Sequence, residues 1–499
     1  MALNSSGPIS LGGATVGQSV NLELGQAATA VISLNDTNVR TLLQVPSGTI
    51  SLNNAYGKSS NSYWIVYLGK ARSSNTATNT VAAGVTNAAH TAPSGITAVQ
   101  MVVPGSGSGQ TVRFTYIGND GTVLSSSNFS GSSTSFSAFI PPATTNSSTT
   151  QFPVVLNNGY QNVINSSYNV AFGNSGYFTP LGTNFHMRRG TFGSDNSFAS
   201  VGMVNAGKSG FRMYFSKFSS GGSLTNLRYF THRNFSDQSS LLPGIYVRSD
   251  NSYLASYYDS RQVLVSLNSS LGNSAQYYEI QPPATSPGGG GVVNLVDNTF
   301  WFLTNDQVCK VDASLASAQF WTFSGRKPGV GASGRPWGFA IYNGILYFGC
   351  SFDSGGSSGD TPSFTIHAWT MASGTFLWSK NFQFNTTSQY SPFTAVQGTS
   401  LYANANGLFI TTYANENYST NQAFLIKVPL TGPANATYSN VAPGNSLTIS
   451  TRTMSVTGSG SCSVTQQNNM SMENATGGQT ATLTPGASTA LSITKTALT

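Results

Sequence analysis

The sequence predicts an all-β protein with a roughly seven-bladed β-propeller at residues 60–440, flanked by small β-rich N- and C-terminal segments. Only 7% of its 499 residues are charged, where about 25% is usual. The polar character comes instead from Ser, Thr, Asn and 53 Gly, while 29 Phe, 22 Tyr and 6 Trp stand in short apolar runs. A disordered chain would be poor in aromatic residues, so this composition indicates many short strands joined by tight turns.

Residues 1–59 form a distinct N-terminal unit. Alternation of apolar and polar residues predicts half-buried strands at 9–11, 20–24, 31–34 and 49–52. Between the last two, Asn35 or Asp36 can cap a short helix that Pro46 ends. The apolar face of that helix would consist of Val39, Leu42 and Leu43.

An irregular internal repeat at 60–440 decides the predicted fold. An apolar strand, a turn and a second strand recur at 112–123, 263–278, 308–321, 364–378 and 423–432. Upstream of the last four lie apolar strands that follow Asn-, Asp- or Gly-bearing turns, at 253–257, 300–303, 345–348 and 408–411. Four-strand repeats of about 40–50 residues are typical of propeller blades. A string of separate β-sandwiches is the alternative, less favoured because no long linker separates the repeats.

Residues 441–499 form a third segment, with short strands expected at 447–450, 454–456 and 481–484 between Gly-rich turns. This segment could close the propeller ring, form a small β-module or pair with a neighbouring molecule. Its sequence does not choose among the three.

Catalytic, cofactor and metal sites are not predicted. Within 60–440 the glutamates are Glu279 and Glu416, and Asp is a common residue of tight turns. Dispersed histidines and three widely spaced cysteines match neither a metal signature nor a disulfide framework, so buried thiols are expected. These residues are His90, His186, His232, His367, Cys309, Cys350 and Cys462.

Residues 186–233 carry an excess of positive charge, with seven cations against the single acid Asp195. Placed on chain expected to form consecutive blades, these cations predict a candidate surface for lipopolysaccharide phosphate or an acidic glycan. They could equally be scattered over blade exteriors or face another subunit. The candidate residues are Arg188, Arg189, Arg212, Arg228 and Arg233.

The N-terminus lacks the basic and apolar regions of a signal peptide, and no apolar run approaches the ~18 residues of a membrane span. We therefore expect synthesis in a cytoplasm and no membrane insertion. The chain also has no Lys/Arg run, so a nucleic-acid partner is not expected.

The first 59 residues resemble an N-terminal unit of tail and other structural proteins of tailed phages that infect cyanobacteria and marine bacteria. The resemblance covers about an eighth of the chain and is carried by residues 17–25, 32–36, 39–42, 47–52 and 56–59. Residues 63–69 and 121–123 resemble the degenerate propeller repeats that often follow this unit, although the second and third repeats depart from the pattern.

This resemblance implies a non-enzymatic structural component of a phage tail, fibre or baseplate, present in several copies on the virion and released by lysis. Residues 1–59 would bind other virion proteins, and the propeller would contact host glycan or lipopolysaccharide. It implies no cofactor and no catalytic residues. One alternative is a lectin-like receptor-recognition protein, which predicts a pocket lined by Tyr or Trp with Asn or Asp. A less favoured alternative is a polysaccharide-degrading enzyme, which predicts two carboxylates ~5–9.5 Å apart in a cleft.

Overall fold

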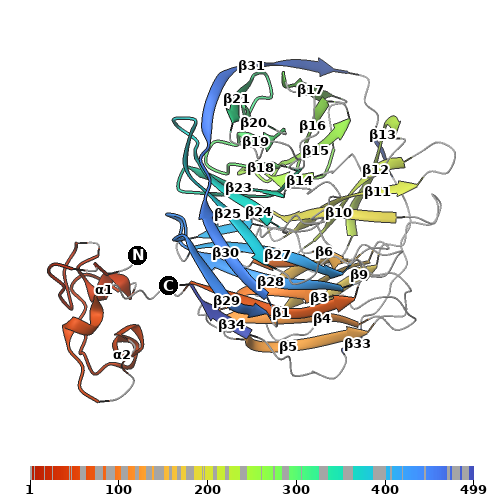
Figure 1. Ribbon diagram of the computed structural model, residues 1–499. Coiled ribbons are helices and arrows are strands. Elements are labelled where there is room, and N and C mark those ends of the chain that lie inside the picture. Colours follow the sequence, from red (N-terminus) through yellow and green to blue (C-terminus); the bar gives the residue numbers. More distant parts are fainter. Residues whose placement is uncertain are drawn as a thin grey trace. The chain divides into compact units, whose positions relative to one another are not determined.

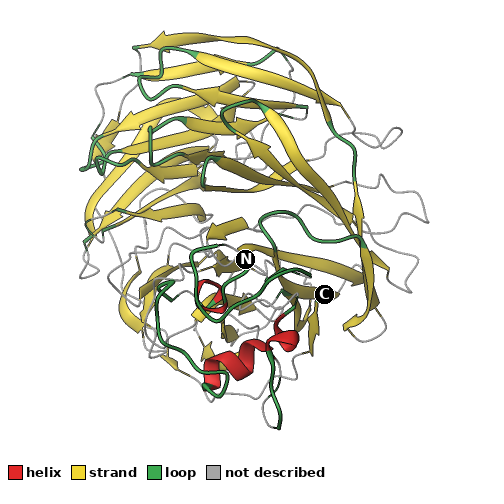
Figure 2. Cartoon of the chain, turned by 90° about the vertical axis from the view of Figure 1, so that its left-hand side faces the viewer, coloured by secondary structure: helices red, strands yellow, loops and turns green. Residues whose placement is uncertain are grey.

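All of the described regular structure from Trp64 onward is β-strand, which confirms the predicted fold class (Figures 1 and 2). The chain divides into two units, Met1–Tyr63 and Trp64–Thr499, each described here by itself. The computed structural model describes residues 3–4, 6–15, 17–24, 26–43, 45, 48–56, 63–72, 82–85, 96–102, 111–118, 123–130, 138–139, 151–156, 160–165, 170–175, 185–193, 195, 197–205, 211–219, 224–235, 244–259, 261–272, 276–283, 291–304, 306–324, 335–351, 363–385, 401–404, 407–417, 420–442, 445–468, 472–474, 484–485 and 494–498.

The N-terminal unit contains helices where strands were predicted. Helix α1 (Val20–Glu23) replaces the strand expected at 20–24, and the 3₁₀-helix η1 (Leu52–Ala55) begins at the end of the strand expected at 49–52. The strands expected at 9–11 and 31–34 are also wrong, since those residues form no strand beyond an isolated bridge of Ser10 with Ser19. The prediction at 20–24 was wrong because Ser19 caps α1, its side-chain oxygen accepting a hydrogen bond from the Leu22 backbone N–H. A Ser cap stabilises a helix start by about 1 kcal/mol, which alternation alone does not reveal.

Helix α2 (Thr37–Leu43) confirms the predicted helix. Its apolar face, Val39, Leu42 and Leu43, is buried in a small core with Leu3 and Val20. The unit therefore holds a hydrophobic core of its own, made from residues distant in its sequence.

Within the described residues, β1 to β28 form seven four-stranded antiparallel blades. The bounds of the blades, in chain order, are as follows. Blade one is β2 (Ala82–Val85), β3 (Ile96–Val102), β4 (Thr111–Gly118) and β5 (Val123–Ser130); blade two is β6 (Ala138–Phe139), β7 (Gln151–Leu156), β8 (Tyr160–Asn165) and β9 (Val170–Ser175); blade three is β10 (Phe185–Phe192), β11 (Phe198–Asn205), β12 (Phe211–Phe218) and β13 (Leu224–Phe235). Blade four is β14 (Gly244–Val247), β15 (Tyr253–Asp259), β16 (Arg261–Leu267) and β17 (Tyr277–Gln281); blade five is β18 (Gly291–Val293), β19 (Phe300–Leu303), β20 (Gln307–Val311) and β21 (Ala318–Ser324); blade six is β22 (Arg335–Tyr342), β23 (Ile345–Ser351), β24 (Ser363–Thr370) and β25 (Thr375–Asn385).

Blade seven joins the two ends of the propeller. It contains β26 (Leu401–Asn404), β27 (Gly407–Asn417), β28 (Thr420–Val428) and β1 (Trp64–Arg72), the first strand of the second unit. The innermost strands of successive blades contact one another from β2 to β26, and β2 also contacts β27 of blade seven. These contacts close the blades into a ring.

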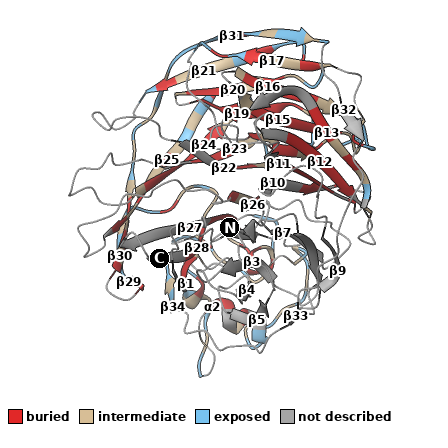
Figure 3. Cartoon of the chain, turned by 90° about the vertical axis from the view of Figure 1, so that its right-hand side faces the viewer, coloured by how far each residue is buried: buried red, intermediate tan, exposed pale blue. Residues whose placement is uncertain are grey.

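Neighbouring blades pack through both faces of their sheets. Along β19, Phe300 and Phe302 belong to the core shared with blade four, whereas Trp301 and Leu303 belong to the core shared with blade six. Because successive side chains of a strand point to opposite faces, a strand between two blades buries the side chains of both faces and is mostly apolar. The continuous apolar runs of the sequence are therefore the strands that lie between blades (Figure 3).

The C-terminal segment has no sheet of its own and adds strands to the outer edges of the blades. We call its strands, β29 to β34, the C-terminal belt. They are β29 (Ala436–Ala442), β30 (Asn445–Thr451), β31 (Ser455–Gln467), β32 (Met472–Asn474), β33 (Thr484–Pro485) and β34 (Thr494–Ala497).

The belt follows the ring in the direction opposite to the order of the blades. Strand β30 pairs with β25 of blade six, and β31 pairs first with β21 of blade five and then with β17 of blade four. Next come β32 on blade three, β33 on blade one and β34 on blade seven. The last belt strand, β34, contacts the first, β29 (Figure 1). Of the three arrangements that the sequence left open, the segment adopts the one that closes the ring.

Ile449 of β30 provides a test of how firmly the belt belongs to the propeller. It is 1% exposed and pairs with Phe382 of blade six. We predict that Ile449→Ala lowers the free energy of unfolding by about 2–5 kcal/mol, because it leaves a cavity between belt and blade. Urea unfolding followed by circular dichroism measures this loss.

Ser461 of the same belt supplies the control, since it is exposed on β31. Ser461→Ala should change the free energy of unfolding by no more than about 0.5 kcal/mol. Equal stability of the two variants would contradict a belt that is part of the core.

Candidate functional site

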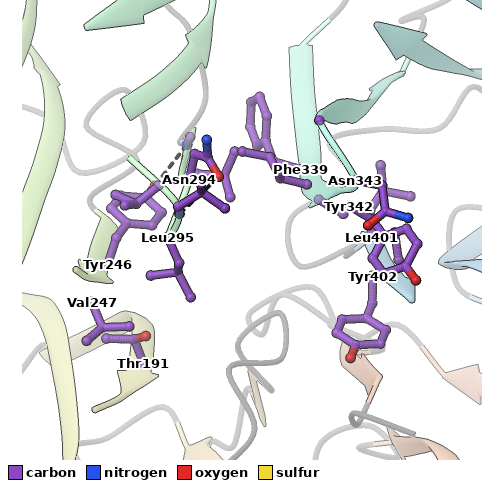
Figure 4. A pocket seen from close by; sticks show the side chains of 18 of the residues that line it. Thr191, Tyr246, Val247, Asn294, Leu295, Phe339, Tyr342, Asn343, Leu401 and Tyr402 are labelled. Atoms are coloured by element: carbon purple, nitrogen blue, oxygen red, sulfur yellow. Dashed lines mark hydrogen bonds between the residues drawn. The ribbon is translucent and has the colours of Figure 1, made fainter. Parts of the chain in front are cut away.

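A pocket of about 380 Å³ lies where five innermost strands end (Figure 4). In a propeller the innermost strands surround a central channel. Small-molecule sites usually have volumes of ~300–1,000 Å³. Thr191 of β10, Val247 of β14, Val293 of β18, Tyr342 of β22 and Ala403 of β26 all line it. Each residue is at or near the C-terminal end of its strand, so blades three to seven each contribute to the pocket.

The walls of this pocket include strand edges. In the described sheets, the innermost strand of each blade pairs with one neighbour only, as β18 does with β19. The second edge of such a strand presents backbone N–H and C=O groups that no described strand pairs. One of them, the Gly291 N–H of β18, donates to the Tyr246 hydroxyl, and those without a protein partner need a hydrogen bond from a ligand or from water.

Aromatic rings and side-chain amides supply the remaining chemistry of the pocket. Figure 4 shows Tyr246 and Asn294 on one side and Phe339, Tyr342 and Asn343 on the other. Among the described lining residues none is Lys, Arg, His, Asp or Glu. The lining is therefore apolar and uncharged, with hydroxyl and amide groups at its border.

Tyr246 is held in place by the adjacent blade. Its hydroxyl oxygen accepts a hydrogen bond of 2.8 Å from the backbone N–H of Gly291, and its ring lies 5.3 Å from that of Phe300. A Cβ at Gly291 would come within 2.5 Å of the Trp301 carbonyl oxygen, so position 291 requires glycine. Blades four and five are thus joined at the pocket wall.

A repeated sequence motif forms the turns next to the pocket. Asp-Asn-Ser/Thr-Phe/Tyr occurs at 195–198, 250–253 and 297–300, after the innermost strands of blades three, four and five. In each turn the Asp carboxylate accepts hydrogen bonds from the backbone and the hydroxyl of the Ser or Thr two residues later. Hydrogen bonds from Ser252 hold the pKa of Asp250 below its ordinary value. The sequence predicts that Asp residues belong to tight turns, but this motif, which aligns three blades, was not predicted.

The turns of blades four and five also bind each other. Asn298 has a positive φ of 56° and donates its side-chain amide to Ser249 Oγ at 2.8 Å. Its side-chain oxygen accepts a bond of 2.8 Å from the Ser249 backbone N–H. This double contact fixes the relative position of two turns beside the pocket.

Two apolar side chains in the β18–β19 turn are open to solvent at the mouth of the pocket. Leu295 is 50% exposed and Val296 is 92% exposed. Both line the pocket. Exposed apolar residues beside a cavity are typical of sites that contact a ligand or partner.

The structure places the predicted basic residues in blade three alone rather than on consecutive blades, because the four strands of that blade span 185–235. Arg188 and Arg189 lie in β10, Arg212 in β12, and Arg228 and Arg233 in β13. The half-buried side chain of Arg228 is described; the other four arginine side chains lie outside the described part of the structure. A binding role for these residues stays a prediction.

Lys217, a further cation of the basic segment, has a structural role. Its ammonium group donates to the Ser269 carbonyl oxygen at 2.7 Å, lies 3.5 Å from the Asp195 carboxylate and faces the Tyr253 ring. Partial burial raises the pKa of Asp195, but hydrogen bonds from Ser197 and the Lys217 charge lower it further, so the net shift is downward. Lys217 therefore joins blades three and four.

The described residues hold no group of three or more His, Cys, Asp or Glu side chains that could bind a metal ion. Glu279 is paired with Arg261 at 2.7 Å. Cys309 and Cys462 are buried free thiols, as expected, and burial raises the pKa of Cys309 well above its usual value. The side chains of His90, His186, His232 and Cys350 fall outside the described part of the structure, as does Glu416. Among the described helices, none is both long and apolar enough to cross a membrane.

His367 and Ser379 form a buried hydrogen-bonded pair in blade six. His367 Nδ1 lies 2.8 Å from Ser379 Oγ, and the imidazole packs against the rings of Phe348 and Phe376. Burial, with a smaller contribution from the Arg452 charge, lowers the pKa of His367 to about 3. The two side chains are at most 3% exposed, so this pair stabilises the blade and offers no access to a substrate.

Comparisons with known proteins show only distant likenesses. No protein-family model and no curated protein matches the chain. A protein of unknown function from Bacteroides caccae is 9% identical, with a TM-score of 0.35 over 57% of this chain and 93% of that one. The Dos1 propeller is 9% identical, with a TM-score of 0.35 over 66% and 79%. A neuraminidase-like protein of subtype N11 from the virus A/flat-faced bat/Peru/033/2010 is 11% identical, with a TM-score of 0.32 over 74% and 96%. Such likenesses carry no argument about function.

The buried imidazole of His367 predicts a loss of stability in acid. Its folded pKa of about 3 lies below the ordinary 6.5, so the unfolded chain takes up a proton first as pH falls. The stabilisation is complete above about pH 6.5 and decreases by about 2–5 kcal/mol toward pH 3. His367→Gln should remove this dependence, measured as the free energy of unfolding from pH 7 to pH 3.

Ser379→Ala is the matched control, because it removes the hydrogen bond and keeps the imidazole. It should retain the wild-type slope in acid. An unchanged slope in His367→Gln would show that other groups cause the acid sensitivity.

Proposed function

We propose that the protein is a non-enzymatic structural component of a tailed-phage virion, belonging to the tail, a fibre or the baseplate. It is made in the host cytoplasm, is present in several copies on the particle and reaches the exterior by lysis. Its N-terminal unit binds other virion proteins, and its propeller contacts the host surface.

The observation that carries this proposal is the division of the chain into two units with separate cores. The smaller unit, Met1–Tyr63, coincides with the segment whose sequence resembles the virion unit of phage structural proteins. A separate core lets the unit serve as an attachment module whatever follows it. Val31 in this unit is 100% exposed, which suits a residue that a partner covers.

The propeller is held closed by two sets of strand pairs, which suits a protein that acts outside cells. Strand β1 closes the ring by pairing with β28, and β34 of the C-terminal belt pairs with the other edge of β1. Opening blade seven therefore breaks both sets of strand pairs. Disulfides often stabilise extracellular proteins, yet Cys309 and Cys462 are free thiols. In this protein we assign the stabilising role of disulfides to the strand pairs that close the ring.

The recognition alternative is favoured by one specific observation, the pocket with three tyrosines and two asparagines. A degrading enzyme would need paired carboxylates in a cleft. The described lining of the pocket has none, and Asp195, Asp250 and Asp297 hold turns. We therefore assign no reaction to the propeller and expect it to bind without chemical change.

Removal of residues 1–59 tests the proposal. The shortened chain should remain soluble and keep the far-ultraviolet circular dichroism of a β-protein, because the propeller core lies after Tyr63. We expect it to be absent from purified particles, as measured by quantitative immunoblotting after complementation of a phage that lacks the gene. Incorporation at the wild-type copy number would overturn the attachment role.

A point substitution refines this test. Val31→Asp places a charge on the exposed apolar residue and should lower incorporation about tenfold or more if a partner covers it. Ser6→Asp, at another exposed position of the same unit, adds the same charge and should leave incorporation unchanged. Equal incorporation of both variants would exclude Val31 from the interface.

A further inference from the structure

We propose that the channel pocket binds a small neutral saccharide, such as the terminal sugars of an uncharged glycan. The inference deepens the host-contact part of the proposed function and rests on it.

Charge excludes the ionic ligand classes. The described lining from Thr191 to Ala403 contains no ammonium, guanidinium or carboxylate group. The innermost strands β2 and β6, with sequences AAGV and AF, lack ionisable side chains. The innermost strands β10 and β22 carry Arg188, Arg189 and Arg335, which are not among the described lining residues. A buried charge needs an opposite charge or many hydrogen bonds, so the pocket disfavours phosphates, acidic sugars and amines.

The strand edges exclude ligands that are purely apolar. A hydrocarbon in the channel would remove water from the backbone N–H and C=O groups on the open edges of β14, β18 and β22. Leaving such groups without a hydrogen bond is unfavourable. The ligand must therefore carry many neutral donors and acceptors of its own, as a saccharide does.

The aromatic and amide side chains suit the two kinds of surface on a sugar ring. The C–H face of a pyranose packs against aromatic rings, which the partly exposed Tyr402 and Tyr342 provide on one side of the pocket (Figure 4). Its hydroxyls both donate and accept, and so do the carboxamides of Asn294 and Asn343. Both kinds of group line the same pocket of about 380 Å³.

The mouth of the pocket is open to solvent at the β18–β19 and β22–β23 turns. Leu295, Val296 and Asn343 are exposed there. A glycan could enter by its end while its remaining sugars stay outside. Leu295 and Val296 would then be covered by the bound sugar.

Binding is measured by saturation-transfer difference NMR on the full-length protein. The neutral probes are maltotriose, lactose and N,N′-diacetylchitobiose at millimolar concentration. Sialyllactose tests an acidic sugar, and an uncharged Val/Ser peptide tests an extended peptide. We expect at least one neutral saccharide to bind and the other two classes not to bind.

Substitutions at Tyr402 locate the site. Tyr402→Ala should weaken binding of the neutral saccharide about tenfold or more, because the stacking ring is lost. Tyr402→Phe keeps the ring and should bind within about threefold of wild type. Circular dichroism of each variant confirms that the propeller is folded.

Two leucines of similar exposure provide a test substitution at the pocket and a control substitution away from it. Leu295, at the mouth, is 50% exposed, and Leu377 of β25, which is not among the lining residues, is 54% exposed. Leu295→Ala should weaken saccharide binding, whereas Leu377→Ala should not change it.

The proposal is overturned if no neutral saccharide binds, if sialyllactose or the peptide binds instead, or if Tyr402→Ala binds as wild type does. Incorporation into particles separates this failure from that of the proposed function. A Tyr402→Ala protein that is incorporated normally leaves the virion role intact whatever its sugar binding. Normal sugar binding with no particle association would refute the virion role alone.

Discussion

The pairing of β1 with β28 is the interaction on which the rest of the propeller depends. It joins Trp64–Arg72 to Thr420–Val428, so the first and last strands of the ring share one sheet. Trp64, Ile65 and Val66 are fully buried in this blade. Without the pairing, blades one and seven would each expose an apolar face, and the channel and its pocket would have no fixed width. Contacts between residues so distant in sequence form late in folding, which makes a second closure by the belt valuable.

The ring geometry also explains the composition. Strands between blades are buried on both faces, so they carry few charged residues, of which Lys217 and Lys427 are buried examples. Asp250 and Asp297 lie in turns. The turns must be short, and Asn251, Asn298 and Asn343 adopt positive φ there. Low charge, frequent aromatic runs and abundant Asn and Gly are thus consequences of one architecture. The same geometry collects the open edges of the innermost strands around the channel and makes the pocket neutral.

How far the sequence predicted the structure depended on burial. The second and third strands of blades four to seven were recognised because burial on both faces makes them largely apolar, as in β19. Strand β24 is buried as well, although it includes Thr365 and His367. In α1 the pattern Val-Asn-Leu-Glu fits a strand or a short helix. The hydrogen bond from the Leu22 N–H to the Ser19 side chain stabilises the helix. The strands expected at 447–450 and 454–456 correspond to β30 and the start of β31, but the full length of β31 was not predicted because this strand is largely exposed and polar (Figure 3). The pocket was missed because five distant strand ends form it, with no local motif.

Hydrogen exchange at β1 tests the doubly closed ring most directly. Trp64–Tyr67 pairs with β28 on one edge and with Thr494–Ala497 of β34 on the other. In a chain that lacks residues 494–499, the β1 amides that face β34 should exchange much faster, while amides of β15 and β16 in blade four keep their wild-type rates. Mass spectrometry with fragmentation resolves these amides. Unchanged exchange throughout β1 would contradict closure of the ring by the C-terminal belt.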